Sequence, residues 1–295
     1  MISIISAINC GAKRLTRSSN TPKLDSEILL SSILKKTKMD LIAFDKSNLT
    51  RNQILQFSSY LYRREKHEPI SYILNYKEFW SKKIIINKNT LIPRPETEVL
   101  VEMALNKHKG NKKLRFLDLG IGTGCISISI LSEIKKASGV GVDICPKALA
   151  ICKQNLNANK LNNRIKLLRR DIRKNSFNEV FDLIISNPPY LREKEFININ
   201  KSIKLYEPKK SLVSDNIDGL KYINYIIKSY KNNLKMNGIL AMEIGNNQYK
   251  KVFKMLNKYK FRVIKSFKLI NNDIRCIIAT KIKNIFLTFK IFYAL

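Results

Sequence analysis

The sequence predicts an α/β fold in which a small helical domain precedes a mostly parallel sheet. Three observations support this prediction. Apolar residues recur at three- and four-residue spacing from the start of the chain to about Leu74, as in amphipathic helices. From Leu114 onward, short apolar runs alternate with helical stretches, which implies parallel strands joined by right-handed crossovers. Near the end, only residues 270–273 separate two apolar runs, which permits a hairpin but no crossover.

The helical domain is expected to span residues 1–74. Ser19 and Thr21 are candidate N-caps, and Thr50 opens another helix. The domain carries no catalytic signature. It serves either as structural support or as a surface that docks a protein partner, and the residues alone favour neither role. The helical periodicity is clearest in residues 24–34, 41–43 and 54–62.

A β-hairpin linker is expected over residues 75–95. Side chains alternate between Tyr72 and Ile86, and Asn87-Lys88-Asn89 supplies turn chemistry. Two prolines then stiffen the entry to a helix whose first turn carries Glu96 and Glu98, where negative charge is favoured. Most residues of this entry are expected to serve only as a helix start.

The main domain is expected to span residues 96–284 and to hold a seven-stranded sheet. The last two strands form the terminal hairpin, so one strand is antiparallel. Residues 285–295 are expected to be an extra edge strand or a tail. The expected strands are 114–119, 139–143, 165–168, 181–186, 238–244, 261–269 and 274–280, with helices that include 125–136 and 146–159.

The charge is unusual for a globular chain: 55 Lys and Arg against 23 Asp and Glu give a net charge of +32. Such a surface gains affinity for polyanions by counterion release, which suggests an RNA-rich or ribosomal partner. However, lysine, asparagine and isoleucine are over-used throughout, as drifting base composition would produce. Both explanations remain open.

The five cysteines include no C-x-x-C pair, which argues against a disulfide scaffold or a zinc site. His67 and His108 are too few and too isolated for a histidine-based metal centre. No metal is therefore expected. The N-terminus lacks a basic region and a cleavage site, and no uncharged apolar run approaches the ~20 residues of a membrane span. We expect a cytoplasmic protein with reduced thiols.

A glycine-rich loop follows the first strand, at Asp118-Leu119-Gly120-Ile121-Gly122-Thr123-Gly124. Its three glycines allow a tight turn and close approach of a ligand. The pattern alone is weak evidence for a nucleotide site, and the absence of a Gly-Lys-Ser/Thr ending argues against a P-loop. We expect Gly120, Ile121, Gly122, Thr123 and Gly124 to contact a cofactor.

Acidic residues after the next two strands complete the expected cofactor site. Asp143 stands 19 positions after Gly124, the spacing at which an acid binds ribose hydroxyls in doubly wound folds. Asp171 follows the third strand and is expected to face the adenine edge, with Ile172 packing on the flat face of the ring. A nucleoside cofactor is therefore expected.

The fourth strand ends at Asn187-Pro188-Pro189-Tyr190. Neither proline has an N–H for a β-ladder and each fixes φ near −65°, so the chain turns a rigid corner there. Backbone carbonyls without a strand partner can accept N–H groups from a ligand. Because strands one and four are neighbours at the switch point of such sheets, the corner is expected to lie beside the glycine loop. The pattern indicates a planar, amino-bearing substrate.

Together these motifs resemble class I S-adenosylmethionine-dependent methyltransferases that act on an amide or exocyclic amine. Flanking segments narrow the resemblance, over nearly the whole chain, to the HemK/PrmC release factor glutamine methyltransferases. Asn75 and the turn at 271–275 depart from that family by lacking a glycine, and neither touches the site. The flanking segments are Arg63-Arg64, Glu68-Pro69-Ile70-Ser71-Tyr72-Ile73, Glu78-Phe79-Trp80, Leu91-Ile92-Pro93-Arg94-Pro95-Glu96-Thr97-Glu98, Glu207-Pro208 and Asp218-Gly219-Leu220.

The resemblance implies a Rossmann-like fold, S-adenosylmethionine as cofactor, and methylation of the glutamine N5 in the Gly-Gly-Gln motif of class I peptide chain release factors. It also implies that the Asn187 side-chain oxygen and the Pro188 carbonyl each accept one N–H of that amide, and that Tyr190 stacks on the amide plane. With Pro189, these are the expected catalytic residues, and Asn187 is also expected to contact the cofactor. The N-terminal helices would dock the release factor, and a monomer is expected.

Two other functions compete with this one. An RNA or DNA amino-group methyltransferase, acting on adenine N6 or guanine N2, shares the Asn-Pro-Pro-Tyr sequence and suits the charge. Against it, residues 1–74 lack the interleaved aromatic and basic residues that stack on bases. A ribosome-associated binding protein with a vestigial cofactor fold is less consistent with the intact glycine loop, Asp143 and Asn-Pro-Pro-Tyr.

Overall fold

The chain is described by a computed structural model that covers residues 2–108, 113–174, 177–214, 217–269 and 272–282. The expected C-terminal tail, residues 285–295, lies outside the described residues. In the part of the chain that is described, no helix is long and apolar enough to cross a membrane.

The N-terminal part is helical and has its own apolar core, in which Leu15, Leu29 and Leu30 are fully buried. Thr50 is the N-cap of a helix, as its sequence predicts, and the structure adds a capping box with Gln53. Thr21 occupies the N-cap position of α2, but its side chain makes no capping hydrogen bond. Its backbone N–H donates to the Ser19 hydroxyl, 3.0 Å away. The helices are α1 Ile4–Leu15, α2 Pro22–Leu34, α3 Lys38–Ala43, α4 Arg51–Glu65 and α5 Ile70–Leu74.

The linker contains the expected hairpin, formed by β1 Tyr76–Phe79 and β2 Lys82–Ile85. Its turn consists of Trp80 and Ser81, both with positive φ, and the separate turn after Asn87 is closed by a 3.0 Å bond from Thr90 N–H to the Asn87 carbonyl. The strand-like alternation predicted for Tyr72-Ile73-Leu74 is wrong, because these residues belong to the helix α5. Such a short apolar run fits one helical turn as well as a strand.

Asn75 ends α5 in the left-handed region, with φ of 61°. Asparagine adopts this conformation more readily than most residues. It can therefore replace the glycine that the family usually has at this position. The hairpin is fixed to the main domain by the buried Asn155, whose side chain exchanges two hydrogen bonds with Ile85 and donates a third to the Thr123 carbonyl. The linker thus contacts the glycine loop through one side chain.

A seven-stranded sheet forms the main domain, in the order β5-β4-β3-β6-β7-β9-β8. Neighbours are parallel from β5 to β7, whereas β9 runs antiparallel to both β7 and β8, as predicted. The strand expected from 238 begins earlier, because Leu234 already pairs with Phe181 before a register shift. The strands are β3 Arg115–Leu119, β4 Ser138–Asp143, β5 Ile165–Arg169, β6 Phe181–Ser186, β7 Leu234–Glu243, β8 Phe261–Lys268 and β9 Ile274–Lys281.

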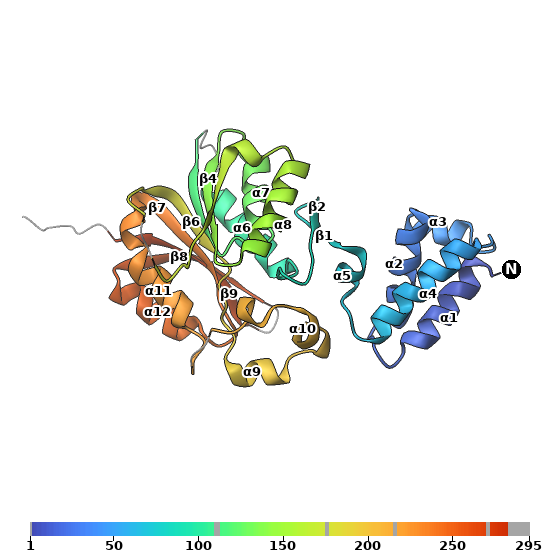
Figure 1. Ribbon diagram of the computed structural model, residues 1–295. Helices are drawn as coiled ribbons and strands as arrows, with labels where there is room; N and C mark the ends of the chain where they lie inside the picture. Colours follow the sequence, from blue (N-terminus) through green and yellow to red (C-terminus); the bar gives the residue numbers. More distant parts are fainter. Residues whose placement is uncertain (1, 109–112, 175–176, 215–216, 270–271, 283–295) are drawn as a thin grey trace, which may run out of the picture.

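Helices cover both faces of this sheet (Figure 1). One apolar core lies against α6, α7 and α8, and a second lies against α11 and α12; Leu183 and Ile184, adjacent on β6, contribute to different cores. The helices are α6 Pro95–Lys107, α7 Cys125–Glu133, α8 Pro146–Ala158, α9 Glu193–Asn198, α10 Lys201–Tyr206, α11 Lys221–Ser229 and α12 Tyr249–Lys258, with short 3-10 turns at Asn162–Arg164, Lys209–Ser211 and Lys231–Asn233.

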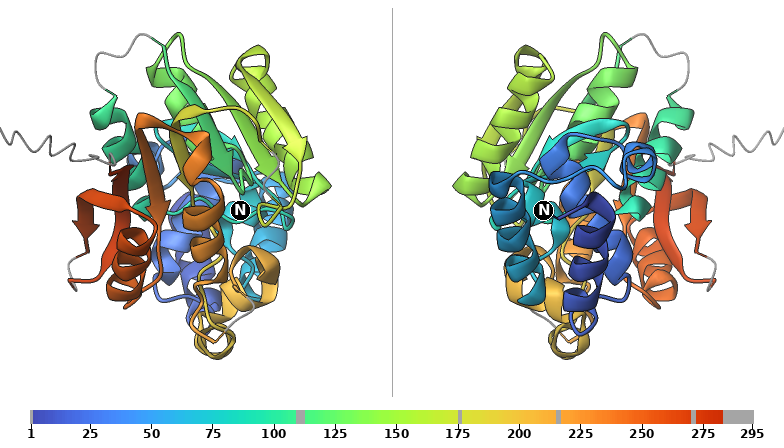
Figure 2. Two further views of the ribbon diagram at one scale, coloured as in Figure 1. Left: turned by 90° about the vertical axis from the view of Figure 1, so that its left-hand side faces the viewer. Right: turned by 90° about the vertical axis from the view of Figure 1, so that its right-hand side faces the viewer.

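The N-terminal helices lie to one side of the sheet domain and are connected to it through α5 and the hairpin (Figure 1). Figure 2 shows the same helices behind the sheet domain in one view and in front of it in the other. Side chains also join the two parts: the Ser202 hydroxyl donates to the His67 carbonyl at 2.7 Å, and the Tyr206 hydroxyl donates to the Lys66 carbonyl at 2.9 Å. The segment that holds α10 therefore contacts the end of α4.

Candidate active site

The glycine loop joins β3 to α7, and its three glycines all have positive φ. The N–H groups of Gly120 and Ile121 both donate to the Val142 carbonyl at 2.9 Å, which fixes the loop on the neighbouring strand β4. A Cβ built on Gly120 would meet no atom within 4 Å, so the space beside this residue is open. A ligand can approach the backbone there.

Asp143 lies directly against this loop. Its Oδ2 accepts the Gly122 N–H at 3.0 Å, and its Oδ1 accepts the Cys145 N–H at 2.8 Å. Burial raises the pKa of this carboxyl. Because a carboxylate oxygen accepts more than one hydrogen bond, each oxygen keeps capacity for a ligand hydroxyl.

Asp118 begins the glycine motif and is 1% exposed. Its Oδ2 accepts the Ser127 hydroxyl at 2.6 Å, whereas its Oδ1 has no hydrogen-bond partner among the described residues. Burial raises the pKa of Asp118 to about 7. Burial thus favours the protonated form of this carboxyl.

A cavity of about 70 Å³ brings the glycine loop and the Asn-Pro-Pro-Tyr corner together. Residues 120–123 form one wall and Asn187 contributes another. The segment before α6 also lines it, through Pro93, Arg94 and Thr97. From its sequence this segment is mainly a helix start, although its motif carries part of the resemblance.

The rest of the Asn-Pro-Pro-Tyr corner is held by its backbone. Pro188 is buried, and Pro189 and Tyr190 are partly buried. The Tyr190 N–H donates to the Leu212 carbonyl at 3.2 Å, and the Tyr190 carbonyl accepts the Gln248 side-chain N–H at 2.8 Å. Tyr190 itself does not line the cavity; its ring lies 4.8 Å from the guanidinium carbon of Arg275.

Asp171 and Ile172 lie outside the set of residues that line this cavity. Both carboxylate oxygens of Asp171 accept hydrogen bonds from the Arg173 guanidinium at 2.7 and 3.0 Å, and this contact lowers the pKa of Asp171. Ile172 is 8% exposed within the core beside α11. Its carbonyl accepts the Tyr230 hydroxyl at 2.9 Å.

A buried polar cluster, which the sequence did not predict, lies behind Asn187. Asn187 Nδ2 lies 3.1 Å from Thr97 Oγ1, which is 2.7 Å from Oε2 of the fully buried Glu243. Burial raises the pKa of Glu243. The Arg275 guanidinium lies 3.3 Å from the same carboxylate. The sequence does carry one sign of this cluster, because Glu243 is a charged residue within the apolar run 238–244.

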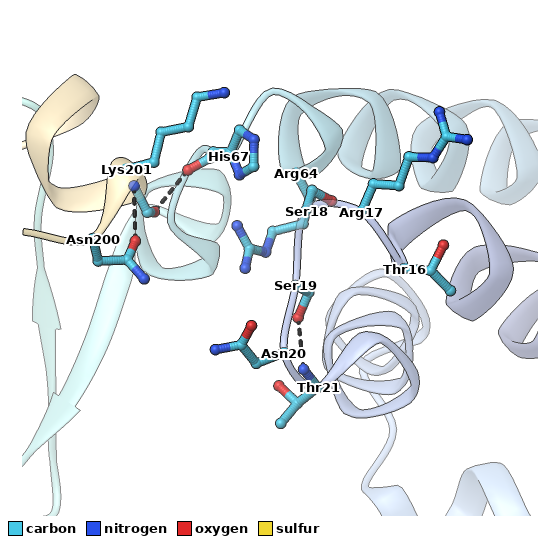
Figure 3. Close-up of a pocket in the computed structure, with 11 residues that line it drawn as sticks. Thr16, Arg17, Ser18, Ser19, Asn20, Thr21, Arg64, His67, Asn200 and Lys201 are labelled. Carbon is cyan, nitrogen blue, oxygen red and sulfur yellow. Dashed lines mark hydrogen bonds between the residues drawn. The ribbon is translucent and has the colours of Figure 1, made fainter.

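A larger and separate cleft, of about 350 Å³, lies where the N-terminal helices meet α10 (Figure 3). Its walls are the loop between α1 and α2, the end of α4 with Arg64 and His67, and Asn200 to Ser202. The Arg64 guanidinium is already bonded to Asp25 at 2.7 Å. This cleft shares no lining residue with the cavity at the glycine loop.

Comparison with known proteins gives matches along most of the chain. A family model described as the PrmC N-terminal domain matches residues 6–74, and one described as the methyltransferase small domain matches residues 95–215. A release factor glutamine methyltransferase from Buchnera aphidicola subsp. Acyrthosiphon pisum is 39% identical over 263 residues, which cover 89% of this chain and 93% of that protein. One from Coxiella burnetii is 35% identical over 90% of this chain and 94% of its own.

Among solved structures, a methyltransferase from Pyrococcus furiosus has a TM-score of 0.48 and 15% identity, over 67% of this chain and 88% of that chain.

Proposed function

The chain belongs to the release factor glutamine methyltransferase family, and from this premise we propose that it transfers a methyl group from S-adenosylmethionine to the side-chain amide nitrogen, N5, of the Gly-Gly-Gln glutamine in class I peptide chain release factors. The observation that supports this most directly is the cavity shared by the glycine loop and Asn187. A cofactor loop and an amide-binding corner must meet for methyl transfer to occur.

The residues at the glycine loop fit S-adenosylmethionine. The open space beside Gly120 admits a ligand against the backbone, and the Asp143 oxygens keep lone pairs for ribose hydroxyls. The loop residues from Gly120 to Gly124, with Asp143, would therefore hold the cofactor. When bound, S-adenosylmethionine supplies an electrophilic methyl group on a sulfonium sulfur.

We propose that Asp171 and Ile172 lie at the adenine end of the same site. The Arg173 guanidinium fixes the orientation of the Asp171 carboxylate, which would face the adenine edge. Ile172 offers an apolar side chain beside it.

The protein must make a poor nucleophile react, because the lone pair of an amide nitrogen is delocalised into its carbonyl. The Asn187 side-chain oxygen and the Pro188 carbonyl would each accept one N–H of the glutamine amide, and Tyr190 would cover the amide plane. Pro189 keeps the corner rigid, since its φ is fixed. Orientation of this kind contributes up to ~7–11 kcal/mol in favourable cases.

No strong base is needed in this scheme. Once the nitrogen has gained a methyl group it is very acidic, and its proton passes to water. The pKa values of the nearby carboxyls Asp143 and Glu243 are both raised by burial, but neither has to remove a proton before the transfer.

The N-terminal helices, residues 1–74, would supply part of the surface that docks the release factor, and residues 96–284 would form the methyltransferase domain. We propose that the protein acts as a monomer in the cytoplasm. Its net charge of +32 is the observation that favours nucleic acid as an alternative acceptor.

The decisive experiment is methyl transfer from labelled S-adenosylmethionine to a purified release factor. A matched factor with Ala in place of the glutamine of its Gly-Gly-Gln loop is the control, and bulk tRNA and rRNA are offered separately. Label on the intact factor alone is the expected result. Label on RNA would show that the proposed protein acceptor is wrong and that the net positive charge serves to bind an RNA substrate.

A further inference from the structure

We infer that a buried chain of hydrogen bonds determines the direction in which the side-chain amide of Asn187 points. This inference rests on the proposed function, because it concerns the atom that would accept the substrate N–H. We call the chain the orienting relay; it consists of Arg275, Tyr190, Glu243 and Thr97.

The first step of the relay begins at a side chain that can only donate. Arg275 Nη2 lies 2.6 Å from the Tyr190 hydroxyl oxygen, and a guanidinium has donors and no acceptor. The Tyr190 oxygen must therefore accept, which leaves its own proton free. That proton is directed to Glu243 Oε1, 3.2 Å away.

The second step passes through Glu243, which is fully buried at the end of β7. Burial raises the pKa of Glu243, whereas the Arg275 guanidinium, 3.3 Å from Oε1, and the hydroxyls of Thr97 and Tyr190 favour its ionised form. The Thr97 hydroxyl donates to Glu243 Oε2 at 2.7 Å, and the Tyr190 hydroxyl donates to Oε1. The single proton of Thr97 is therefore used on the carboxylate.

The last step fixes Asn187. Since the single proton of Thr97 goes to Glu243, the Thr97 oxygen must accept from the amide atom 3.1 Å away. That atom is therefore the nitrogen, Nδ2. With Nδ2 held by Thr97, Oδ1 occupies the other branch of the amide and remains available as an acceptor.

The consequence concerns substrate choice. An amide with Oδ1 available accepts an N–H from a glutamine side chain, whereas the flipped amide would present N–H groups to other N–H groups. The relay makes the flipped form unfavourable, because it would leave Thr97 without a donor. Thr97, Glu243 and Arg275 are positioning residues for Asn187, which would touch the substrate.

The fold brings these residues together from separate elements. Thr97 stands in the first turn of α6, Glu243 ends β7, and Arg275 lies on β9. Because β9 pairs with β7 and Glu243 lies opposite Cys276, the antiparallel strand is what supplies the guanidinium. Thr97 is 2% exposed, so water competes little with the contact.

The test compares Thr97→Val with Thr97→Ser in the full chain, with a release factor as substrate. Valine keeps the shape and removes the hydroxyl, so kcat is expected to fall roughly tenfold to a hundredfold while cofactor affinity, measured by calorimetry, stays within about twofold. Serine retains the hydroxyl and is expected to restore kcat to within about threefold. A structural role alone would lower the melting temperature of Thr97→Val and leave kcat of the folded protein unchanged.

Unchanged kcat in folded Thr97→Val, with an active wild type, would overturn the relay and leave the proposed function standing. An inactive wild type would instead reject the proposed function. If the valine variant fails to fold, Thr97→Cys takes its place, because a thiol is a weak donor and acceptor. A kcat reduced several-fold is then expected, and a wild-type kcat would count against the relay.

Discussion

The guanidinium of Arg94 lies 2.5 Å from Oε1 of Glu207, a side chain that is 1% exposed. The second oxygen of Glu207 accepts the Ile92 N–H at 3.1 Å. Arg94 lines the cavity at the glycine loop, whereas Glu207 follows α10, which contacts the N-terminal helices. This pair therefore connects the cavity wall to the segment that bridges the two parts of the protein.

We predict that Glu207→Ala lowers the free energy of unfolding by about 2–3 kcal/mol. Breaking a fully buried pair costs about 3–5 kcal/mol, and a smaller loss is expected here because 26% of the Arg94 side chain reaches solvent. Chemical denaturation measures the change. Glu193→Ala is the matched control, since its ion pair with Lys209 is exposed and should contribute under about 1 kcal/mol. Equal losses in both variants would contradict the prediction.

Asn187→Ala is expected to remove most turnover and to leave cofactor affinity nearly intact. The substitution deletes the side-chain oxygen that would accept the substrate N–H, but it does not touch the glycine loop. Single-turnover methylation and calorimetric binding of S-adenosylmethionine measure the two quantities separately. Asn257→Ala, on the exposed face of α12, is the control and should behave as wild type. If turnover and cofactor affinity fell together, the assigned role would be wrong.

Asp143→Ala is expected to weaken cofactor binding first. Its carboxylate holds the Gly122 N–H and would also hold the ribose, and hydrogen bonds to a charged group contribute about 1.5–3 kcal/mol each. The Michaelis constant for S-adenosylmethionine should therefore rise at least about tenfold. Methylation at saturating cofactor should recover much of the wild-type rate. An unchanged Michaelis constant would remove the ribose assignment.

Gly120→Ala is expected to lower cofactor affinity more than stability. A left-handed residue with a Cβ costs about 1–2 kcal/mol, and Gly120 has φ of 76°. The added methyl would also enter the open space that the cofactor requires. Asn75→Ala is the control, because its φ of 61° is similar and it lies outside the cavity. Because Asn75 already has a Cβ, thermal melts should show a smaller loss in Asn75→Ala than in Gly120→Ala, and cofactor binding should fall in Gly120→Ala alone.

The buried Asp118 should make the stability of the cofactor-free protein depend on pH. Burial raises the pKa of Asp118 to about 7 in the folded state, whereas an unfolded Asp titrates near ~3.9. The folded chain thus binds the extra proton, so stability is full below about pH 4 and falls as pH rises towards about 7, by up to ~1.4 kcal/mol per pH unit.

Asp118→Asn removes this titration and keeps an acceptor for Ser127. The difference in melting temperature between variant and wild type should therefore grow from about pH 4 to about pH 7 and stay level above that. Asp143 and Glu243, whose pKa values are also raised, are present in both proteins and cancel in the comparison. A difference that stays constant with pH would show that Asp118 is ionised throughout.

The sequence by itself determined the features that depend on local backbone chemistry. Glycine spacing located the loop after β3, alternating strands and helices gave the parallel sheet, and the short connection before β9 gave its antiparallel strand. The two prolines after Asn187 located the corner because they cannot join a β-ladder. The error at Tyr72 to Leu74 arose because three apolar residues fit either a strand or a helical turn.

The tertiary structure alone decided which side chains meet. Thr97 contacts Asn187 across 90 positions of sequence and Glu243 across 146. Arg94 and Glu207, both within motifs that carried the family resemblance, are 113 positions apart. Such contacts depend on how α6 packs against β7 and β9 and on which rotamer each buried side chain adopts. A local pattern records neither, because its period reports only which face of an element is apolar.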